Sequence, residues 1–436
     1  MKSTSTKFTS IREAIKKGKG EVAIRGWVYR ERGSNQKRFL VLRDSSEIIQ
    51  CIIDRDSVPA KLWKDAEKLL VESSVEIFGA IREDKRAPTG YEVQVKNLKV
   101  VHFAEKYPLT KDASTEVLLD NRHLALRSRR LTAVMKIRST VTGAIHEFFR
   151  KRGYYEFDAP ILQPTQCEGG STLFSVNYYN QKTFLSQTWQ LYAEAGIFAL
   201  EKIYNMGPTF RAEKSKTSRH LSEFWMAEME AAWMELPELA QVAKDEVKFI
   251  IQQVLNQNKE ELIILGRDIK KLQSSIQKPF PTITYTQALK ILKEKENLNV
   301  SWGKDLRTIE EDKLMKHFDT PVVVTNYPKE IMAFYKPSDP RDPKTALCMD
   351  MLAPEGYGEI IGGSQRDIDI KEIEKALKKD KEDPRNYKFY LDLRKYGSVL
   401  HSGYGLGVER VVSWICGLDN IKDAIPFPRT MLRTTP

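Results

Sequence analysis

The chain has 436 residues, of which 41% are hydrophobic and 30% charged, so it is long enough for two or three domains. Its 70 lysines and arginines outnumber its 59 acids, and the net charge of +11 favours a polyanionic partner such as nucleic acid. No apolar run approaches the roughly 18 residues of a membrane span, so we expect a soluble protein without a membrane partner. The 4 cysteines form no CxxC pair, which disfavours structural zinc and predicts a reducing, cytoplasmic location.

The chain begins with a short helix and continues as an all-β module. Ser10 and Glu13 match a capping box, which predicts a helix ending at Gly18 or Gly20. Alternating apolar residues then predict one helix at about 60–70 and strands at 21–29, 38–43, 48–53, 74–82 and 91–102. This pattern suits an OB-type barrel, a fold that often binds nucleic acid.

A polar connector at 106–131 separates this module, residues 1–105, from a larger domain at 132–436. The larger domain opens with an amphipathic helix at 132–152. Strands are expected at 183–232 and 346–361, and further helices at 237–256, 286–295, 370–379 and 407–417. Because strands and helices do not alternate regularly, we predict an antiparallel α+β domain.

A first candidate for chemistry is Phe210-Arg211-Ala212-Glu213, which follows an apolar strand and precedes a polar loop, Lys214 to His220. A hairpin that presents arginines and a histidine suits a polyphosphate, because a guanidinium group binds phosphate oxygens through paired hydrogen bonds. Taken alone, the same pattern also describes a surface hairpin with a salt bridge.

A second candidate is the glycine-rich segment from Gly403 to Arg410. A dinucleotide-binding fold would need a further strand and an acid about 20 residues on, and neither follows here. The glycines instead indicate a strand-to-helix junction where the backbone approaches a ligand or a neighbouring strand, with Arg410 in the first turn of the helix.

A third candidate is the pair Asp350 and Glu359, on either side of a turn that contains Pro354 and Gly356. On antiparallel neighbouring strands these carboxylates would suit Mg²⁺ held by triphosphate oxygens. Taken alone, the pair could equally be two unrelated surface acids. The adjoining run from Gly362 to Arg366 favours the metal site, because a glycine pair in a strand indicates close approach of a ligand.

In their order and spacing along the chain, the three candidates resemble motifs 2 and 3 of the class II aminoacyl-tRNA synthetases, at about 207–230 and 403–430, and the strands between these motifs. Residues 149–160 resemble motif 1. More narrowly, the chain resembles the aspartate, asparagine and lysine subgroup, and within it the asparaginyl enzymes of the compact archaeal type. The resemblance implies an ATP- and Mg²⁺-dependent ligase of protein biosynthesis. Such an enzyme would activate L-asparagine, charge the 3′-terminal ribose of tRNA(Asn), and form a homodimer.

The resemblance also implies roles for individual residues. Arg211 and Arg410 would be catalytic phosphate ligands, and Asp350 and Glu359 would hold the metal. The full ATP site implied by the family is Arg211, Glu213, Arg219, His220, Phe224, Asp350, Glu359, Gly407 and Arg410. The amino-acid site is Glu168, Gln187, Gln190, Glu228, Ser364 and Arg366, and the anticodon site is Arg30, Arg32, Phe39 and Gln50.

Three departures and three alternatives accompany this resemblance. Ala193 replaces a lysine of aspartyl enzymes, Trp189 stands where a smaller residue is usual, and no Pro-Gly follows Thr430. The alternatives are an aspartyl-tRNA synthetase, including one that accepts two tRNAs, a tRNA-independent enzyme related to asparagine synthetase, and a degenerate paralogue that only binds RNA or protein. The barrel disfavours the second alternative. The retained Arg211, Arg410, Asp350 and Glu359 disfavour the third.

Overall fold

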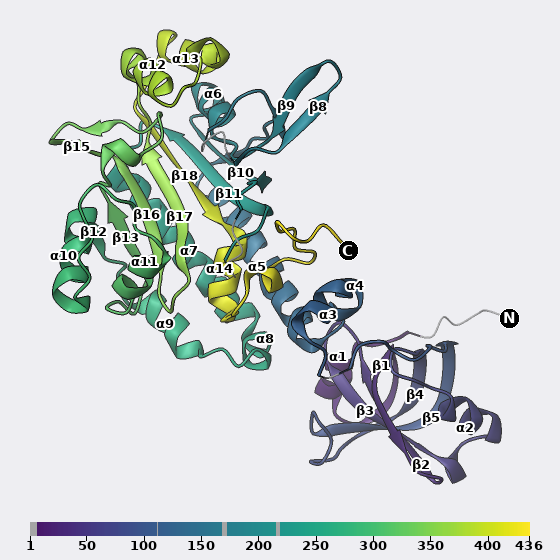
Figure 1. Cartoon of the computed structure of the whole chain (residues 1–436). Helices are drawn as coiled ribbons and strands as arrows, with labels where there is room; N and C mark the ends of the chain where they lie inside the picture. The colour runs from purple at the N-terminus through teal and green to yellow at the C-terminus, as the bar shows by residue number, and fades with distance from the viewer. Residues whose placement is uncertain (1–6, 111, 168–171, 215–218) are drawn as a thin grey trace. The chain divides into compact units, whose positions relative to one another are not determined.

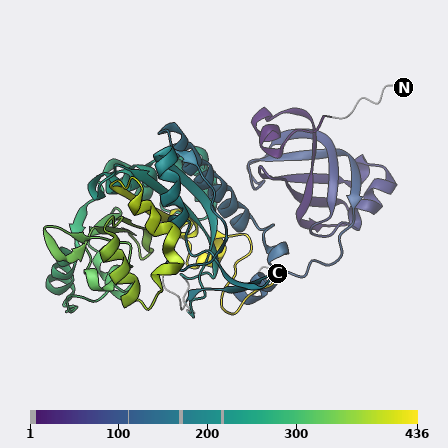
Figure 2. The same cartoon turned by 90° about the horizontal axis from the view of Figure 1, so that it is seen from above.

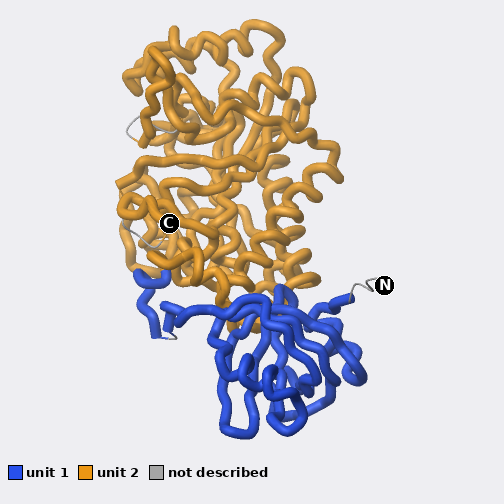
Figure 3. Tube along the Cα trace, turned by 90° about the vertical axis from the view of Figure 1, so that its right-hand side faces the viewer, with its two compact units in different colours: residues 1–118 blue, residues 119–436 orange. Residues whose placement is uncertain are grey.

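The computed structural model describes residues 7–110, 112–167, 172–214 and 219–436 and divides into two compact units, 1–118 and 119–436 (Figure 3). The division falls inside the expected connector. Among the described residues, no helix is both long and apolar enough to cross a membrane.

Unit 1 contains a closed barrel with the strand order β1-β2-β3-β5-β4 (Figures 1 and 2). Its strands are β1 (Gly20–Gly33), β2 (Lys37–Arg43), β3 (Ile48–Asp54), β4 (Ser74–Glu83) and β5 (Tyr91–His102). Helix α1 (Ile11–Lys17) has the expected capping box and ends at Gly18, and helix α2 (Ala60–Glu67) precedes β4. Buried residues such as Ile24, Leu40 and Leu42 form the core of the barrel. The predicted OB-type module is confirmed.

Unit 2 is built on an eight-stranded sheet with the order β12-β13-β16-β17-β18-β11-β10-β6. Only the outer pairs, β12 with β13 and β10 with β6, are parallel, so the antiparallel α+β prediction is confirmed. The strands of this sheet are β6 (Tyr155–Glu156), β10 (Lys202–Phe210), β11 (Glu223–Ala232), β12 (Thr282–Thr284), β13 (Val322–Thr325), β16 (Cys348–Ala353), β17 (Gly358–Gln365) and β18 (His401–Gly407). Two smaller sheets contain β7 (Leu162–Gln163), β8 (Ser175–Tyr178), β9 (Gln181–Leu185), β14 (Ser338–Asp339) and β15 (Asp342–Ala346).

Three long or buried helices, α5, α7 and α14, form the main core together with the large sheet. The helices after the barrel are α3 (Thr115–Asp120), α4 (Arg122–Ala125), α5 (Arg129–Lys151), α6 (Gln190–Leu200), α7 (Leu236–Gln257), α8 (Lys259–Ile264), α9 (Ile269–Gln277), α10 (Tyr285–Glu296), α11 (Thr308–Met315), α12 (Ile370–Lys379), α13 (Lys388–Lys395) and α14 (Val408–Cys416). Short 3₁₀ helices lie at Arg55–Ser57, Lys329–Ile331, Pro384–Tyr387 and Ile421–Ala424. All five helices predicted for this domain are found, as α5, α7, α10, α12 and α14.

The expectation that strands predominate throughout 183–232 is wrong for one segment. Residues 190–200 form helix α6, which lies with α12 and α13 at one end of the large sheet (Figure 1). The segment is rich in alanine and leucine, which favour a helix. Its apolar residues lie on more than one face because both sides of α6 are covered, and this obscures the helical period.

A buried carboxyl group lies under strand β18. Glu246 of α7 is inaccessible to solvent and accepts a hydrogen bond of 2.5 Å from the Tyr404 hydroxyl. Burial raises the pKa of Glu246 from its ordinary value of 4.5 to about 8. The folded state therefore retains a proton that the unfolded chain releases, and this group's contribution to stability is lost as pH rises from about 4.5 to about 8.

We expect Glu246→Gln to raise the melting temperature at pH 8 more than at pH 5, because the glutamine never has to hold a proton. Each unit of pKa shift corresponds to roughly 1.4 kcal/mol, so the gain at pH 8 should be a few kcal/mol at most. Asp245→Asn removes the same charge at the adjacent, less buried position and is the matched control. Thermal unfolding of the three proteins at both pH values tests this. Equal melting shifts at pH 5 and pH 8 would contradict it.

Candidate functional site

A polar cavity of about 260 Å³ lies between the β10–β11 hairpin and the junction of β18 with α14. Its lining includes eight of the nine residues predicted to bind ATP: Arg211, Glu213, Arg219, His220, Phe224, Glu359, Gly407 and Arg410. The ninth, Asp350, lies beside Glu359, as described below. Residues from distant parts of the sequence therefore meet in one cavity of suitable polarity for a nucleotide.

The β10–β11 hairpin positions the first group of these residues. Phe210 pairs with Glu223 at the end of the hairpin, so Arg211 and Phe224 are close neighbours. The Arg211 guanidinium carbon lies 5.5 Å from the centre of the Phe224 ring. His220 Nε2 lies 3.6 Å from Glu213 Oε2. Burial and the charges of the nearby arginines lower the pKa of His220, so this ring is mostly neutral at pH 7.

The junction of β18 with α14 positions a further part of the cavity wall. Strand β18 ends at Gly407, which is the N-cap of α14, and Arg410 lies in the first turn. Arg410 Nη1 donates to the Glu359 carbonyl oxygen at 2.6 Å and lies 3.4 Å from Glu359 Oε2. The predicted strand-to-helix junction is therefore confirmed, and its arginine faces strand β17.

The glycines of β18 allow side chains of the neighbouring strand β11 to lie across it. A Cβ at Gly403 would lie 2.0 Å from Glu230 Oε2, and a Cβ at Gly405 would lie 2.3 Å from Met226 Cε and 3.4 Å from Glu228 Cγ. Larger residues at these positions would displace the carboxylates from the sheet surface. The close approach expected from the sequence is thus an approach to the adjacent strand.

Asp350 and Glu359 lie on the antiparallel neighbours β16 and β17, as predicted. A Cβ at Gly362 would lie 2.9 Å from Glu359 Oε1 and 3.6 Å from Asp350 Oδ1, so both carboxylates converge over this glycine. Burial and the Glu359 charge raise the pKa of Asp350 to about 7. Burial and the same two carboxylates raise the pKa of Glu311, on α11, to about 8. Carboxylates that converge and raise one another's pKa fit the ligand preferences of a divalent cation.

Helix α11 also supplies a residue that the sequence did not single out. Asp312 accepts two hydrogen bonds from Arg219 Nη2, each of 2.9 Å. Arg219, which lines the cavity, thus has a carboxylate partner on α11. Nothing in the local sequence links these residues, because 93 positions separate them and α11 was not predicted.

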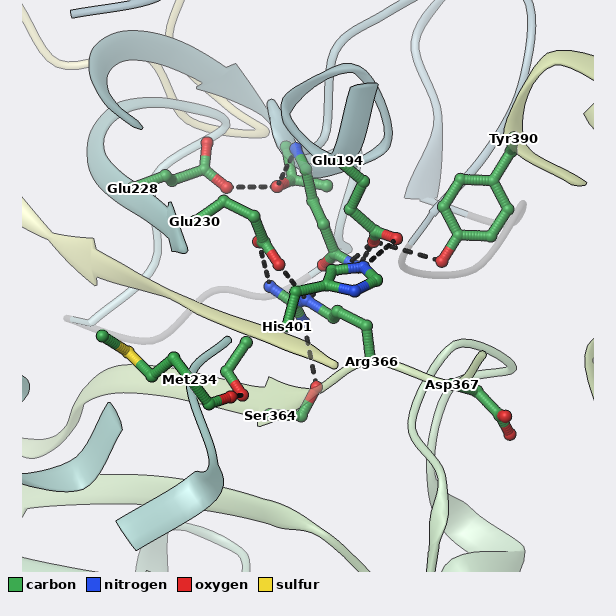
Figure 4. Close-up of polar contacts among 12 residues, drawn as sticks. Glu194, Glu228, Glu230, Met234, Ser364, Arg366, Asp367, Tyr390 and His401 are labelled. Atoms are coloured by element: carbon green, nitrogen blue, oxygen red, sulfur yellow. Dashed lines mark hydrogen bonds and ion pairs between the residues drawn. The ribbon is translucent and has the colours of Figure 1, made fainter. Parts of the chain in front are cut away.

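Arg366, predicted to bind the amino acid, lies in a second group of polar residues (Figure 4). Its Nε and Nη2 donate to the two oxygens of Glu230 at 3.0 and 2.9 Å, and its Nη1 donates to Ser364 Oγ at 2.9 Å. All three side chains are buried. The guanidinium group is therefore rigidly oriented by β11 and β17.

Glu228 lies in the same group and is 7% exposed. Its carboxylate accepts from the Thr188 hydroxyl and, at 3.0 Å, from the Trp189 backbone N–H. The large Trp189 side chain is accommodated by burial, with its Nε1 donating to the Phe157 carbonyl oxygen at 2.7 Å. The nearby Ala193 is fully buried, so the position that carries a lysine in aspartyl enzymes presents no charge here.

Gln187 and Gln190 complete the predicted amino-acid residues that can be described. Gln187 Nε2 donates to Thr172 Oγ1 at 2.7 Å, and Gln190 Nε2 donates to Glu194 Oε1 at 3.0 Å. Glu168 lies outside the described residues. The segment expected to be an active-site strand is a helix from Gln190 onward, which is a correction to the sequence interpretation.

The structure adds Glu194, Tyr390, Arg394 and His401 to this group, none of which was predicted. Glu194, Glu230 and His401 have the spacing of metal ligands, but Arg366 and Arg394 already bind both carboxylates. Two guanidinium groups leave no electrostatic need for a cation here. The helical spacing of Gln190 and Glu194, four residues apart, would have paired them if α6 had been predicted.

The predicted anticodon residues lie on the barrel strands. Arg32 and Phe39 are register partners on β1 and β2, with the guanidinium carbon 5.0 Å from the ring centre. Phe39 is half-buried whereas its neighbour Leu40 is buried, so the predicted alternation is confirmed. Arg30 is exposed. Gln50 is 7% exposed and donates to the buried Glu92 at 3.0 Å, which the sequence did not predict.

Each of the two units matches the model of a known protein family. Residues 22–101 match the model of the OB-fold nucleic acid binding domain, and residues 114–431 match that of the class II tRNA synthetases (D, K and N). The asparagine–tRNA ligase of Thermococcus kodakarensis is 47% identical over 417 residues, which are 95% of this chain and 96% of that protein. That of Desulforamulus reducens is 42% identical over 429 residues, covering 98% and 99% of the two chains.

Solved structures agree with the sequence comparison. The Pyrococcus horikoshii asparaginyl-tRNA synthetase complexed with asparaginyl-adenylate has a TM-score of 0.94 and 44% identity, covering 99% of this chain and 100% of that one. The Entamoeba histolytica aspartyl tRNA synthetase has a TM-score of 0.87 and 26% identity over 100% and 94%. The resemblance noted from the motifs is therefore confirmed, and the chain belongs to the asparaginyl-tRNA synthetases, within the class II tRNA synthetases of the D, K and N group.

Proposed function

We propose that this chain activates asparagine with ATP and transfers the asparaginyl group to the 3′-terminal ribose of tRNA(Asn). The observation that carries this proposal is the likeness, over 99% of the chain, to a synthetase solved with asparaginyl-adenylate. ATP–pyrophosphate exchange with asparagine and aspartate side by side tests the first step, and charging of a tRNA(Asn) transcript tests the second. Exchange with aspartate but not asparagine would overturn the proposal.

In the first step, an oxygen of the asparagine α-carboxylate attacks the α-phosphorus, and the bond to the β-phosphate oxygen breaks. The nucleophile is already ionised, so no general base is required. The chain's contribution is to position the reactants and neutralise the charge that develops on the phosphate. In the second step, the terminal ribose hydroxyl of the tRNA attacks the activated carbonyl carbon, AMP leaves, and the hydroxyl proton is released.

The residues of the nucleotide cavity suit these steps. Arg211 would bind the α-phosphate, Phe224 would stack on the adenine ring, and Glu213 would contact the adenine edge. Arg219, His220 and Arg410 would hold the β/γ end, with Gly407 at the helix start, and Asp350 and Glu359 would hold Mg²⁺. When bound, the metal would offset charge on the triphosphate. The converging carboxylates and the raised pKa of Asp350 support that site.

The residues of the second group suit asparagine. Arg366, held by Glu230 and Ser364, can donate to the side-chain oxygen of the substrate, and Glu228 can accept from its NH₂ group. We assign the α-ammonium group to Gln190 and Glu168, with Gln187 completing the site. The neutral Ala193 supports asparagine over aspartate, and the barrel disfavours a tRNA-independent enzyme.

The homodimer and the cytoplasmic location are also part of this proposal. Tyr155 is 59% exposed on β6, the edge strand of the large sheet, and Ile161, in the segment that follows, is 43% exposed. An exposed apolar edge in the motif 1 region supports pairing with a second copy. The four cysteines are buried free thiols, which is compatible with a reducing compartment. Light scattering coupled to gel filtration measures the oligomeric state.

On the barrel, Phe39→Ala and Gln50→Ala are expected to reduce charging of tRNA by about tenfold or more without changing tRNA-independent pyrophosphate exchange. A stacked base contributes about 1–3 kcal/mol, and these residues lie in the unit that does not contain the nucleotide cavity. Because Gln50 is bonded to the buried Glu92, its variant also needs a melting curve. Phe78→Ala, which removes a half-buried aromatic ring of β4, is the matched control and should leave charging unchanged. Equal loss in charging and exchange would mean that these residues support folding instead.

A further inference from the structure

Glu194 is a buried carboxylate at the centre of the second group of polar residues. Its side chain is 0% exposed, and it lies among side chains from α6, α13 and β18 (Figure 4). Oε1 accepts from Gln190 Nε2 at 3.0 Å and from the Tyr390 hydroxyl at 3.1 Å. Arg366 Nε lies 3.9 Å from the same oxygen. Glu194 thus contacts two residues that the proposed function assigns to asparagine.

The other oxygen of Glu194 faces Arg394 and His401. Oε2 accepts from Arg394 Nη2, and His401 Nε2 lies 3.0 Å away. His401 Nδ1 lies 2.7 Å from the Val399 carbonyl oxygen, which can only accept. His401 Nδ1 therefore donates to this carbonyl oxygen, which fixes the orientation of the ring beside Glu194. Arg394 and His401 also hold the pKa of Glu194 well below its ordinary value.

An ionised carboxylate at this place determines how Gln190 is oriented. A carboxylate accepts and cannot donate, so the Gln190 NH₂ group must face Glu194. The amide oxygen of Gln190 then lies on the other side, as the group offered to a ligand. An oxygen suits the α-ammonium group of an amino acid, whereas an NH₂ group in its place would repel it.

We propose that Glu194 is a positioning residue for asparagine, which presents the Gln190 oxygen to the substrate's α-ammonium group. This inference rests on the proposed function, because Gln190 has a substrate to orient only if the chain binds an amino acid. Glu194 touches no reacting atom. Its effect should appear in the affinity for the ammonium group rather than in the affinity for ATP.

The test is Glu194→Gln together with an asparagine analogue that lacks the amino group, succinamic acid, used as a competitive inhibitor. In the variant, Arg394 can only donate and therefore retains the amide oxygen, so the new NH₂ group faces Gln190 and turns the NH₂ group of Gln190 toward the substrate. We expect KM for asparagine to rise about 10- to 100-fold, while KM for ATP and inhibition by succinamic acid change less than about threefold.

The double variant Gln190→Glu with Glu194→Gln keeps the test decisive if the single change weakens the fold. The carboxylate introduced at position 190 would accept from the new amide and again offer an oxygen to the ammonium group. KM for asparagine should therefore recover at least about tenfold relative to Glu194→Gln. A melting curve accompanies each variant.

Three outcomes overturn the inference. An unchanged KM for asparagine in Glu194→Gln would mean that Glu194 does not orient Gln190. An equal loss of affinity for asparagine, ATP and succinamic acid would mean that Glu194 has a purely structural role. So would a KM for asparagine that does not recover in the double variant. In each case asparagine-dependent exchange by the unmodified chain leaves the proposed function standing, whereas its absence would overturn the proposed function as well.

Discussion

Replacement of Arg211 or Arg410 by alanine is expected to lower asparagine-dependent ATP–pyrophosphate exchange by about 100-fold or more. Each guanidinium group lines the nucleotide cavity, and each would neutralise charge that increases on the phosphates as the reaction proceeds. Removing one preorganised donor of this kind typically costs 10²–10³-fold in rate, roughly 3–4 kcal/mol. The expected loss is in kcat, since the contact strengthens in the transition state.

The two arginines differ in their contacts within the protein, so comparing their variants helps to separate an effect on catalysis from an effect on structure. Arg410 also donates to the Glu359 carbonyl oxygen, so its loss removes a contact between α14 and β17, whereas Arg211 contacts the Phe224 ring. Unchanged circular dichroism and melting temperature separate loss of chemistry from loss of structure. Arg385→Ala removes an exposed arginine of the same domain and should leave exchange unchanged. Near-normal exchange in Arg211→Ala would remove this residue from the mechanism.

Most of the fold could be predicted because local signals agree with tertiary structure. Strand β4 of the barrel alternates buried and half-buried residues, and α1 carries its capping box and its glycine stop in the sequence. The glycines of β18 were recognised as sites of close approach. The strand-to-helix junction at Gly407 followed from the same pattern.

The parts that could not be predicted depend on contacts between distant residues. Helix α6 packs on two sides, so its sequence lacks an apolar stripe. Glu194 binds Arg394 and His401 across 200 and 207 positions, and single-sequence patterns carry no signal at that range. Arg122 was assigned to a polar connector, yet it is buried and donates to the carbonyl oxygens of Lys422, Ile425 and Pro426.

The preference for asparagine over aspartate should be strong, at roughly 10⁴-fold in kcat/KM, without any editing step. The predicted side-chain site pairs one donor, Arg366, with one acceptor, Glu228, which matches a carboxamide. Arg366 is already neutralised by a bidentate ion pair with Glu230. An aspartate carboxylate would therefore face Glu228 without a cation of its own, because Ala193 supplies no charge. Relief by protonation would cost free energy near neutral pH.

Glu228→Gln is the variant that tests this preference. The Trp189 backbone N–H can only donate, so the oxygen of the new amide should remain there, and its NH₂ group should take the place of the other carboxylate oxygen. The substrate's side chain would then face an NH₂ donor. This donor can bond to a carboxylate oxygen of aspartate but cannot accept from the NH₂ group of asparagine. We expect asparagine activation to fall and the ratio of asparagine to aspartate activation to drop by about 100-fold or more.

The matched control is Glu201→Gln, which changes an exposed residue at the end of α6 and should keep the ratio of the unmodified chain. Pyrophosphate exchange with both amino acids measures the ratio in all three proteins, and robust activation of aspartate by the unmodified chain would contradict the assignment of Glu228 and Ala193 to substrate selection.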